Sequence, residues 1–204
     1  MARANAKVLE AEMGQPVMVD NRASAAGIVS LDALANSTPD GHTLDLVANT
    51  TATALHFQGK TLDVEKRFVP VGRFATTRVL WVVHPGKIDA TGLRGLVRYL
   101  RSHPSTAITS AGHGGIGHLR LKMFALVQKL DILHVAYRGS TPAMQDVIAG
   151  QVPAMMVDAL TAIPHIQTGK LRPIASVSTT RVPSLAELPT ATEQGFNALK
   201  SIPS

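Results

Sequence analysis

The sequence contains no cysteine, which excludes disulfide bonds, thiolate catalysis and cysteine-ligated zinc. Aromatic residues are scarce, with two tyrosines, one tryptophan and five phenylalanines among 204 residues. The net charge is +6, but the lysines and arginines are scattered and form no basic run. Without a basic run or an aromatic platform, the sequence argues against nucleic acid as a partner, whereas a basic surface suits a small acidic ligand.

Long apolar segments are also lacking. The sequence has no uninterrupted apolar run of the roughly 18 residues that a membrane-spanning helix needs. The chain opens with MARANAKVLEAEM, which is amphipathic and has no basic segment followed by an apolar one. The sequence as it stands therefore predicts neither a membrane span nor an export signal.

Motifs typical of catalytic and metal centres are missing as well. No serine stands in a G-x-S-x-G pattern, so a serine hydrolase has no support. The eight histidines include no H-x-x-x-H or H-E-x-x-H pair, since His113 and His118 are five residues apart across a turn. We therefore predict no catalytic residue and no metal site, and we interpret His118 and His134 as hydrogen-bonded packing residues.

What the sequence does contain is an alternation of helix-like and strand-like segments, and its 45% hydrophobic residues suffice for a core. Helices are predicted at 2–13, 28–35, 93–100, 119–127, 140–149 and 163–166. Strands are predicted at 16–19, 42–48, 107–108, 132–137, 152–157 and 171–177, and in two runs between 68 and 83, of which 79–83 is the stronger. This alternation predicts an α/β fold with parallel-rich sheets flanked by helices, in which ligands bind at the carboxyl ends of strands.

The stretch TSAGHGGIGHL, residues 109–119, is the most informative one. It reads as a strand-to-helix turn, where glycines permit positive φ and close approach to a ligand and the helix presents its positive end. A carboxylate or phosphate group is the expected ligand. The predicted contacts are Ser110, Gly112, His113, Gly114 and Gly115, and the alternative is a turn that only lets strand and helix pack closely.

Three other loops carry candidate ligand contacts. Asn49, Thr50 and Thr51 follow the strand predicted at 42–48 and supply hydroxyl and amide donors, with plain helix capping as the alternative. Arg138, Gly139 and Ser140 form a second strand-to-helix turn, where Ser140 or Thr141 is expected to cap the helix and Pro142 falls in its first turn. Asp158, at a strand end, either accepts a hydrogen bond from the ligand or orients its neighbours.

Gly112, Gly114 and Gly117 also spell G-x-G-x-x-G, the dinucleotide fingerprint, and Asp131 lies at about the right distance to be the ribose acid. Asp131 precedes the apolar run 132–135, however, which places it at the start of a strand instead of its carboxyl end. The alternative function is accordingly a Rossmann-like NAD(P)-binding oxidoreductase.

Six runs follow one another along the chain: GQPVMVDNRASAAG, STPDGHTL, TSAGHGGIGHL, HVAYRGSTPAMQDVIAGQV, MMVDALTAIPHIQTGKLRPIAS and RVPSLAELPTATEQGF. In this order and spacing they resemble the Bug family, the TctC-type solute receptors of tripartite tricarboxylate transporters. The resemblance implies a periplasmic receptor of the type II periplasmic-binding-protein fold, whose two lobes close on a small carboxylate such as a di- or tricarboxylate, or an amino or aromatic acid. It also implies no catalysis, no cofactor, and the membrane components of a transporter as partners.

The chain differs from the family pattern in two respects. Members begin with a signal peptide and a first strand, and they continue beyond 196–204, so we expect an incomplete first lobe with a crossover strand at 1–84, a second lobe at 85–195 and the start of a return segment at 196–204. We expect such a lobe to self-associate or to be loosely held, and to bind carboxylates weakly. Members also carry Ser or Thr after the second glycine of the turn, where this chain has Gly115; His113 is expected to compensate as a donor or to be an exposed turn residue.

Overall fold

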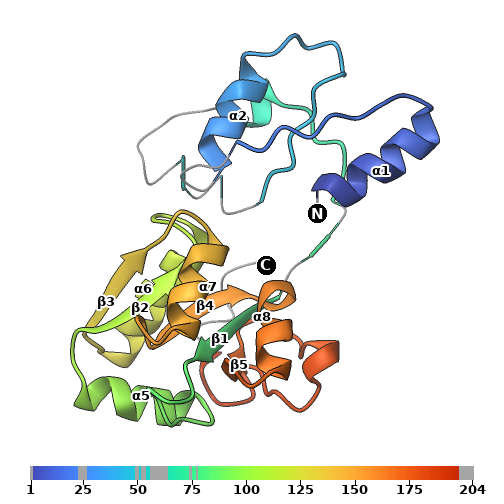
Figure 1. Ribbon diagram of the computed structural model, residues 1–204. Coiled ribbons are helices and arrows are strands. Elements are labelled where there is room, and N and C mark those ends of the chain that lie inside the picture. Colours follow the sequence, from blue (N-terminus) through green and yellow to red (C-terminus); the bar gives the residue numbers. More distant parts are fainter. Residues whose placement is uncertain are drawn as a thin grey trace.

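In the computed structural model, the described residues are 2–22, 27–48, 51, 54–55, 64–73, 75–76 and 78–197. They form an N-terminal body up to Arg73 and a C-terminal body from Arg78 onward (Figure 1). The C-terminal body contains the only β-strands among the described residues. We therefore take the two bodies in turn, beginning with the one that holds the sheet.

The C-terminal body alternates strands and helices as the sequence predicts. Its elements are β1 (Val79–Val83), α5 (Leu93–Ser102), β2 (Thr106–Ser110), α6 (Ile116–Gln128), β3 (Ile132–Ala136), α7 (Ser140–Ile148), β4 (Ala154–Asp158), α8 (Ala159–Gln167), β5 (Arg172–Ser176) and the short 3₁₀ helix η2 (Pro183–Leu185).

The five strands form one sheet in the order β3-β2-β4-β1-β5. Strand β2 pairs in parallel with β3 and β4, whereas β1 pairs antiparallel with β4 and β5. Because β4 and β5 both run antiparallel to β1, the four strands β2, β3, β4 and β5 run in one direction and end at the same edge of the sheet. The parallel-rich α/β prediction is confirmed, and the strand predicted as the crossover out of the first lobe lies inside this sheet.

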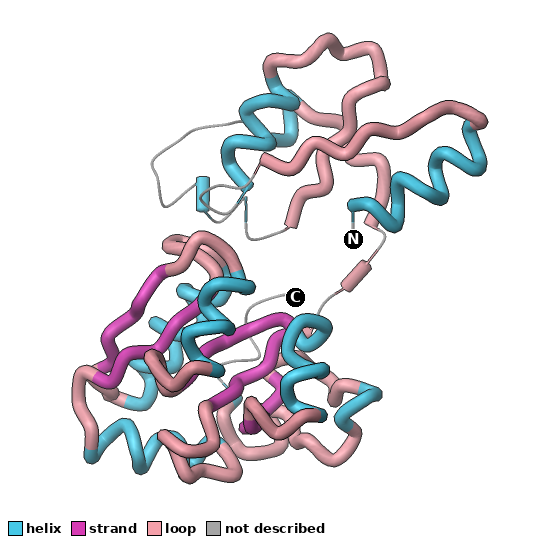
Figure 2. Tube along the Cα trace, viewed as in Figure 1, coloured by secondary structure: helices cyan, strands magenta, loops and turns pink. Residues whose placement is uncertain are grey.

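Helices cover both faces of the sheet (Figure 2). Residues of α5 and α6 pack with Trp81 on one face, where the rings of Trp81 and Phe124 lie 5.2 Å apart. Residues of α7 and α8 pack with Leu80 and Val82 on the other face. All five residues of β1 are buried, which explains why its sequence, VLWVV, is apolar throughout instead of alternating.

The buried face of α6 differs from the predicted one. The sequence pattern favours Leu119, Met123, Phe124 and Val127, but Val127 is 51% exposed. The buried residues are His118, Arg120, Leu121 and Phe124. A search for apolar periodicity misses this face because two of its members are polar.

The N-terminal body contains the helices α1 (Ala2–Met13), α2 (Ile28–Ala35) and α4 (Val64–Arg67). The predicted helices at 2–13 and 28–35 are confirmed, but the strands predicted at 16–19 and 42–48 and the first run after residue 68 are wrong. These segments pair with no strand among the described residues, and Met18 is 95% exposed and Leu44 60% exposed. Apolar residues become a strand only where a neighbouring strand accepts their backbone hydrogen bonds.

No helix of the described part of the chain is long and apolar enough to cross a membrane. The longest, α6, has 13 residues, compared with the roughly 20 that a bilayer requires.

Candidate functional site

The candidate site lies at the edge where the parallel strands end. Strand β2 leads into α6 on one face of the sheet, and its neighbour β4 leads into α8 on the other face. Connections that leave adjacent strands in opposite directions mark the switch point, which is where ligands bind in open α/β sheets. The fold thus brings Ser110, the glycine turn, the turn at Arg138 and Asp158 to one edge.

The glycine turn adopts the backbone conformation that its sequence predicts. Gly112 has φ +95° and Gly114 has φ +77°, both in the left-handed region. Two N–H groups of the turn have partners within the chain: Gly112 donates to the Ser110 carbonyl at 2.9 Å and Gly114 donates to His118 Nδ1 at 3.1 Å. The role of both glycines as ligand contacts stays a prediction. Gly115, at the N-cap of α6, is buried, and its N–H donates to none of the described residues.

The glycine turn also has a packing role, as the structural alternative predicts. A Cβ placed on Gly117 would lie 3.1 Å from the Ser110 Cβ, tighter than ordinary contact. A side chain at position 117 would push α6 away from the end of β2. Gly117 therefore serves the strand–helix contact, while Gly115 is the member of the turn whose donor remains for a ligand.

Three histidines gather behind the turn. The rings of His118 and His134 stack with centroids 4.0 Å apart, and exposed His113 lies 4.6 Å from His118. His134 Nε2 is 2.9 Å from Ser110 Oγ. The interpretation of His118 and His134 as hydrogen-bonded packing residues is confirmed.

The two inner rings, those of His118 and His134, favour the uncharged form near neutral pH. Burial, together with the neighbouring charges of His118, His113 and Lys122, lowers the pKa of His134 to about 4. Burial and the charges of His113 and Lys122 also lower the pKa of His118. Because His118 Nδ1 accepts the Gly114 N–H, its ring proton resides on Nε2.

Arg120 is a residue of this region that sequence reasoning missed. Its side chain is 1% exposed, on the side of α6 that faces the sheet. Burial lowers the pKa of the guanidinium, and the charge of Asp158 opposes this shift. Asp158 thus has a charged neighbour in Arg120, which supports its role in orienting the site, while its predicted contact with a ligand stays a prediction.

The second turn presents Arg138 to solvent ahead of Gly139, whose φ is +113°. Gly139, instead of Ser140 or Thr141, is the N-cap of α7, and no side chain caps the helix, so the predicted hydroxyl cap is wrong. The hydroxyl of Tyr137 donates to Asp146, which raises the pKa of Tyr137. Arg138 forms no ion pair with any described residue.

The candidate contacts in the N-terminal body are described only in part. Asn49 and Thr50 lie outside the described residues. Thr51 is 2% exposed, and its N–H donates to the Ala48 carbonyl at 2.9 Å. The ligand-binding role of all three residues stays a prediction.

The geometry does not favour a dinucleotide or a metal. Asp131 lies at the amino end of β3, the opposite edge from the glycine turn, and accepts a hydrogen bond from Ser105 Oγ at 2.7 Å. It is therefore out of reach of a ligand on Gly112 and Gly114. Within the described ranges, no group of three or more histidine or acidic side chains is arranged to hold a metal ion.

Comparisons with known proteins agree with this geometry. The family model "Tripartite tricarboxylate transporter family receptor" matches residues 1–203. A UPF0065 protein from the tcbD–tcbE intergenic region of a Pseudomonas species is 33% identical over 98% of this chain, and Protein BugT of Bordetella pertussis is 31% identical over 96%. The structure of MatC from Rhodopseudomonas palustris with bound malate is 26% identical, with a TM-score of 0.87 over 98% of this chain and 68% of MatC.

The chain spans 61% of the length of these two curated relatives. Its family match nevertheless extends over nearly every residue, and its C-terminal body has the sheet and edge geometry described above. The chain belongs to the TctC family of tripartite tricarboxylate transporter receptors, whose members are solute-binding proteins and not enzymes.

Proposed function

We propose that this chain binds a small carboxylate at the carboxyl edge of the β2–β4 region and releases it chemically unchanged. The observation that carries the proposal is the pair of helix N-termini at this edge. Helices α6 and α7 both begin there, and neither has a side-chain cap bond or an acidic residue in its first turn. The positive ends of both helices therefore remain available to an anion.

The charges around the carboxyl edge of the sheet support an anionic ligand. Asp158 is the acid among the predicted site residues, and its charge acts on the guanidinium of buried Arg120. Arg138 adds an exposed guanidinium whose planar N–H groups match a carboxylate. We infer that Arg138 and the Gly115 N–H grip the carboxylate, with His113 as a further donor.

The relatives support the ligand class and the setting. MatC, which shares this fold, has bound malate. The family's role in tripartite transport supports a periplasmic location and the delivery of ligand to the membrane components of a transporter. Malate is therefore the first ligand to test.

The test is calorimetric titration of the whole chain with malate and, separately, with NAD. We expect saturable malate binding and no NAD binding. Arg138→Gln should weaken malate binding by about ten- to hundredfold, since one charge-assisted pair contributes about 1.5–3 kcal/mol. Lys170→Gln, which removes a charge from an exposed turn of the same body, should bind as the wild type does. NAD binding without malate binding would overturn the proposal.

A further inference from the structure

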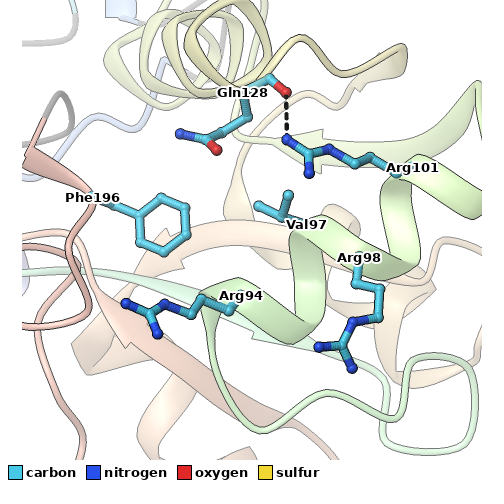
Figure 3. A pocket seen from close by; sticks show the side chains of 6 residues that line it. All are labelled: Arg94, Val97, Arg98, Arg101, Gln128 and Phe196. Carbon is cyan, nitrogen blue, oxygen red and sulfur yellow. Dashed lines mark hydrogen bonds between the residues drawn. The ribbon is translucent and has the colours of Figure 1, made fainter.

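A second basic pocket lies away from the carboxyl edge of the sheet. Its volume is about 360 Å³, and the residues that line it come from α5, the end of α6 and the loop after β5: Arg94, Val97, Arg98, Arg101, Gln128 and Phe196 (Figure 3). Gln128 is the last residue of α6, whereas the glycine turn precedes its first. At 1.5 Å per residue, this 13-residue helix separates the two places by about 20 Å.

The arginines of the pocket stand on one side of α5, at the spacing i, i+4 and i+7. Arg94 points toward the ring of Phe196, and Arg101 points toward Gln128, whose carbonyl accepts a long hydrogen bond of 3.4 Å from Arg101 Nη2 (Figure 3). Arg98 projects away from the ring, at the rim of the pocket. Like charges at this spacing repel one another, so an anion between them removes an unfavourable interaction.

No described acid neutralises these guanidiniums, in contrast to those of Arg172 and Arg181. Arg172 pairs with Asp89 at 2.8 Å, and Arg181 pairs with Glu193 at 3.0 Å. Glu193, three residues before Phe196, is already bonded to Arg181 and to the Thr190 N–H. No ion pair involves Arg94, Arg98 or Arg101 in the part of the chain that the structure describes.

The apolar wall of the pocket is held in place. Phe196 packs on the core ring of Phe124, with centroids 6.0 Å apart, and its N–H donates to the Ala191 carbonyl at 2.8 Å. The Gln194 side chain ties the same loop to the body, accepting from the Leu93 N–H at 2.7 Å and donating to the Ile174 carbonyl at 3.0 Å. The ring is thus a fixed surface beside the guanidinium groups.

We propose that this pocket is a second anion site, which takes a doubly charged oxyanion joined to a flat apolar body. Two planar guanidiniums, those of Arg94 and Arg101, grip the oxyanion through paired N–H donors. The flat body lies against Phe196 and Val97, which is 6% exposed. The simplest molecule with both parts is an aryl phosphate.

The charge and shape of the pocket rank the possible guests. A monocarboxylate brings one charge to three guanidiniums and binds less tightly than a phosphate monoester. Inorganic phosphate brings the charge but leaves Phe196 uncovered. Phenyl phosphate should therefore bind more tightly than either benzoate or inorganic phosphate, by about tenfold, which corresponds to about 1.4 kcal/mol of ring contact or charge.

The experiment is a titration of the whole chain with phenyl phosphate, inorganic phosphate and benzoate, followed by calorimetry and by NMR of the backbone amides. The Arg94→Gln/Arg101→Gln double variant should weaken phenyl phosphate binding by at least about tenfold. Lys7→Gln/Lys170→Gln removes two exposed charges elsewhere and should leave it unchanged. Phe196→Ala should bring the affinity for phenyl phosphate down to that for inorganic phosphate.

Three outcomes would overturn the proposal. Phenyl phosphate binding that does not saturate would show that the three arginines only keep α5 hydrated or bind an acidic protein instead. Equal losses in the arginine and lysine double variants would show attraction to net charge alone. Shifted amides confined to residues 111–116 would place the phosphate at the carboxyl edge. Binding of malate by the arginine variant tells the two sites apart, because the proposed carboxylate site does not use α5.

Discussion

At the residue scale, the environment of His134 lowers the pKa of its imidazole well below the usual value. Its pKa falls from 6.5 to about 4 in the folded chain because burial and the neighbouring His118, His113 and Lys122 charges disfavour the imidazolium. Between these two pH values the unfolded chain therefore binds more protons than the folded chain. This links the stability of the glycine-turn region to pH.

We predict that the contribution of His134 to the free energy of unfolding is level above about pH 6.5 and falls by about 3 kcal/mol as the pH drops toward 4. The lowered pKa of His118 acts in the same direction. Urea unfolding at a series of pH values measures the effect. His134→Gln should make the free energy of unfolding less dependent on pH. His42→Gln, at an exposed position, is the control and should not. Equal pH dependence in both variants would contradict the assignment of the effect to His134.

The bond between Gly114 N–H and His118 Nδ1 leads to a second prediction at the residue scale. His118→Leu leaves a buried donor without this acceptor and should destabilise the fold by about 1–3 kcal/mol. His118→Asn keeps an acceptor oxygen near the Nδ1 position and should recover part of the loss. Urea midpoints measure both variants, and equal destabilisation by Leu and Asn would show that the hydrogen bond is unimportant.

Sequence reasoning found the residues whose role depends on their neighbours in the chain. Positive φ at Gly112 and Gly114 follows from the turn itself, and Ser110 follows from its place at the end of a strand. Arg120 could not be found in this way, because Asp158, whose charge acts on the buried guanidinium, is 38 positions later in the sequence. A charged residue on the buried side of a helix gives no signal until its partner strand is known.

At the scale of the elements, helix and strand formation were predictable where apolar pattern and turn residues agree. Each strand of the five-stranded sheet coincides with a predicted run. The segments at 16–19 and 42–48 have equally suitable residues, yet they are not strands because no strand in the described ranges pairs with them. Pairing is a property of the assembled sheet and is not encoded in the run itself.

The contact between β2 and α6 gives a prediction at this scale. Gly117→Val places a branched side chain where a Cβ already lies 3.1 Å from the Ser110 Cβ, so it should cost about 1–3 kcal/mol of stability. Gly72→Val is the matched control, because nothing lies within 4 Å of its Cβ position. Thermal unfolding measures both, and an equal effect of the two changes would contradict the close-packing role of Gly117.

At the scale of the whole molecule, the apolar surface of the N-terminal body stands out. Val69 is 87% exposed and Val71 83% exposed, in an extended segment that pairs with no described strand. Extended apolar segments with unused backbone groups attract other chains.

We predict that the 204-residue chain self-associates through the N-terminal body. Light scattering should give a mass above that of one chain, and Val69→Thr/Val71→Thr should lower it. Leu126→Thr/Val127→Thr, on an exposed face of α6, is the control and should leave the mass unchanged. A monomeric wild-type chain would contradict the prediction.

The central claim is that a small carboxylate binds where α6 and α7 begin, and backbone NMR of the isotope-labelled chain during a malate titration tests it most directly. The account predicts saturable shifts of the Gly115, Ile116, Gly139 and Ser140 amides, weakened by Arg138→Gln, with the amides of α5 unmoved. Saturable shifts confined to other parts of the chain, or shifts at this edge that Arg138→Gln leaves unaltered, would contradict it.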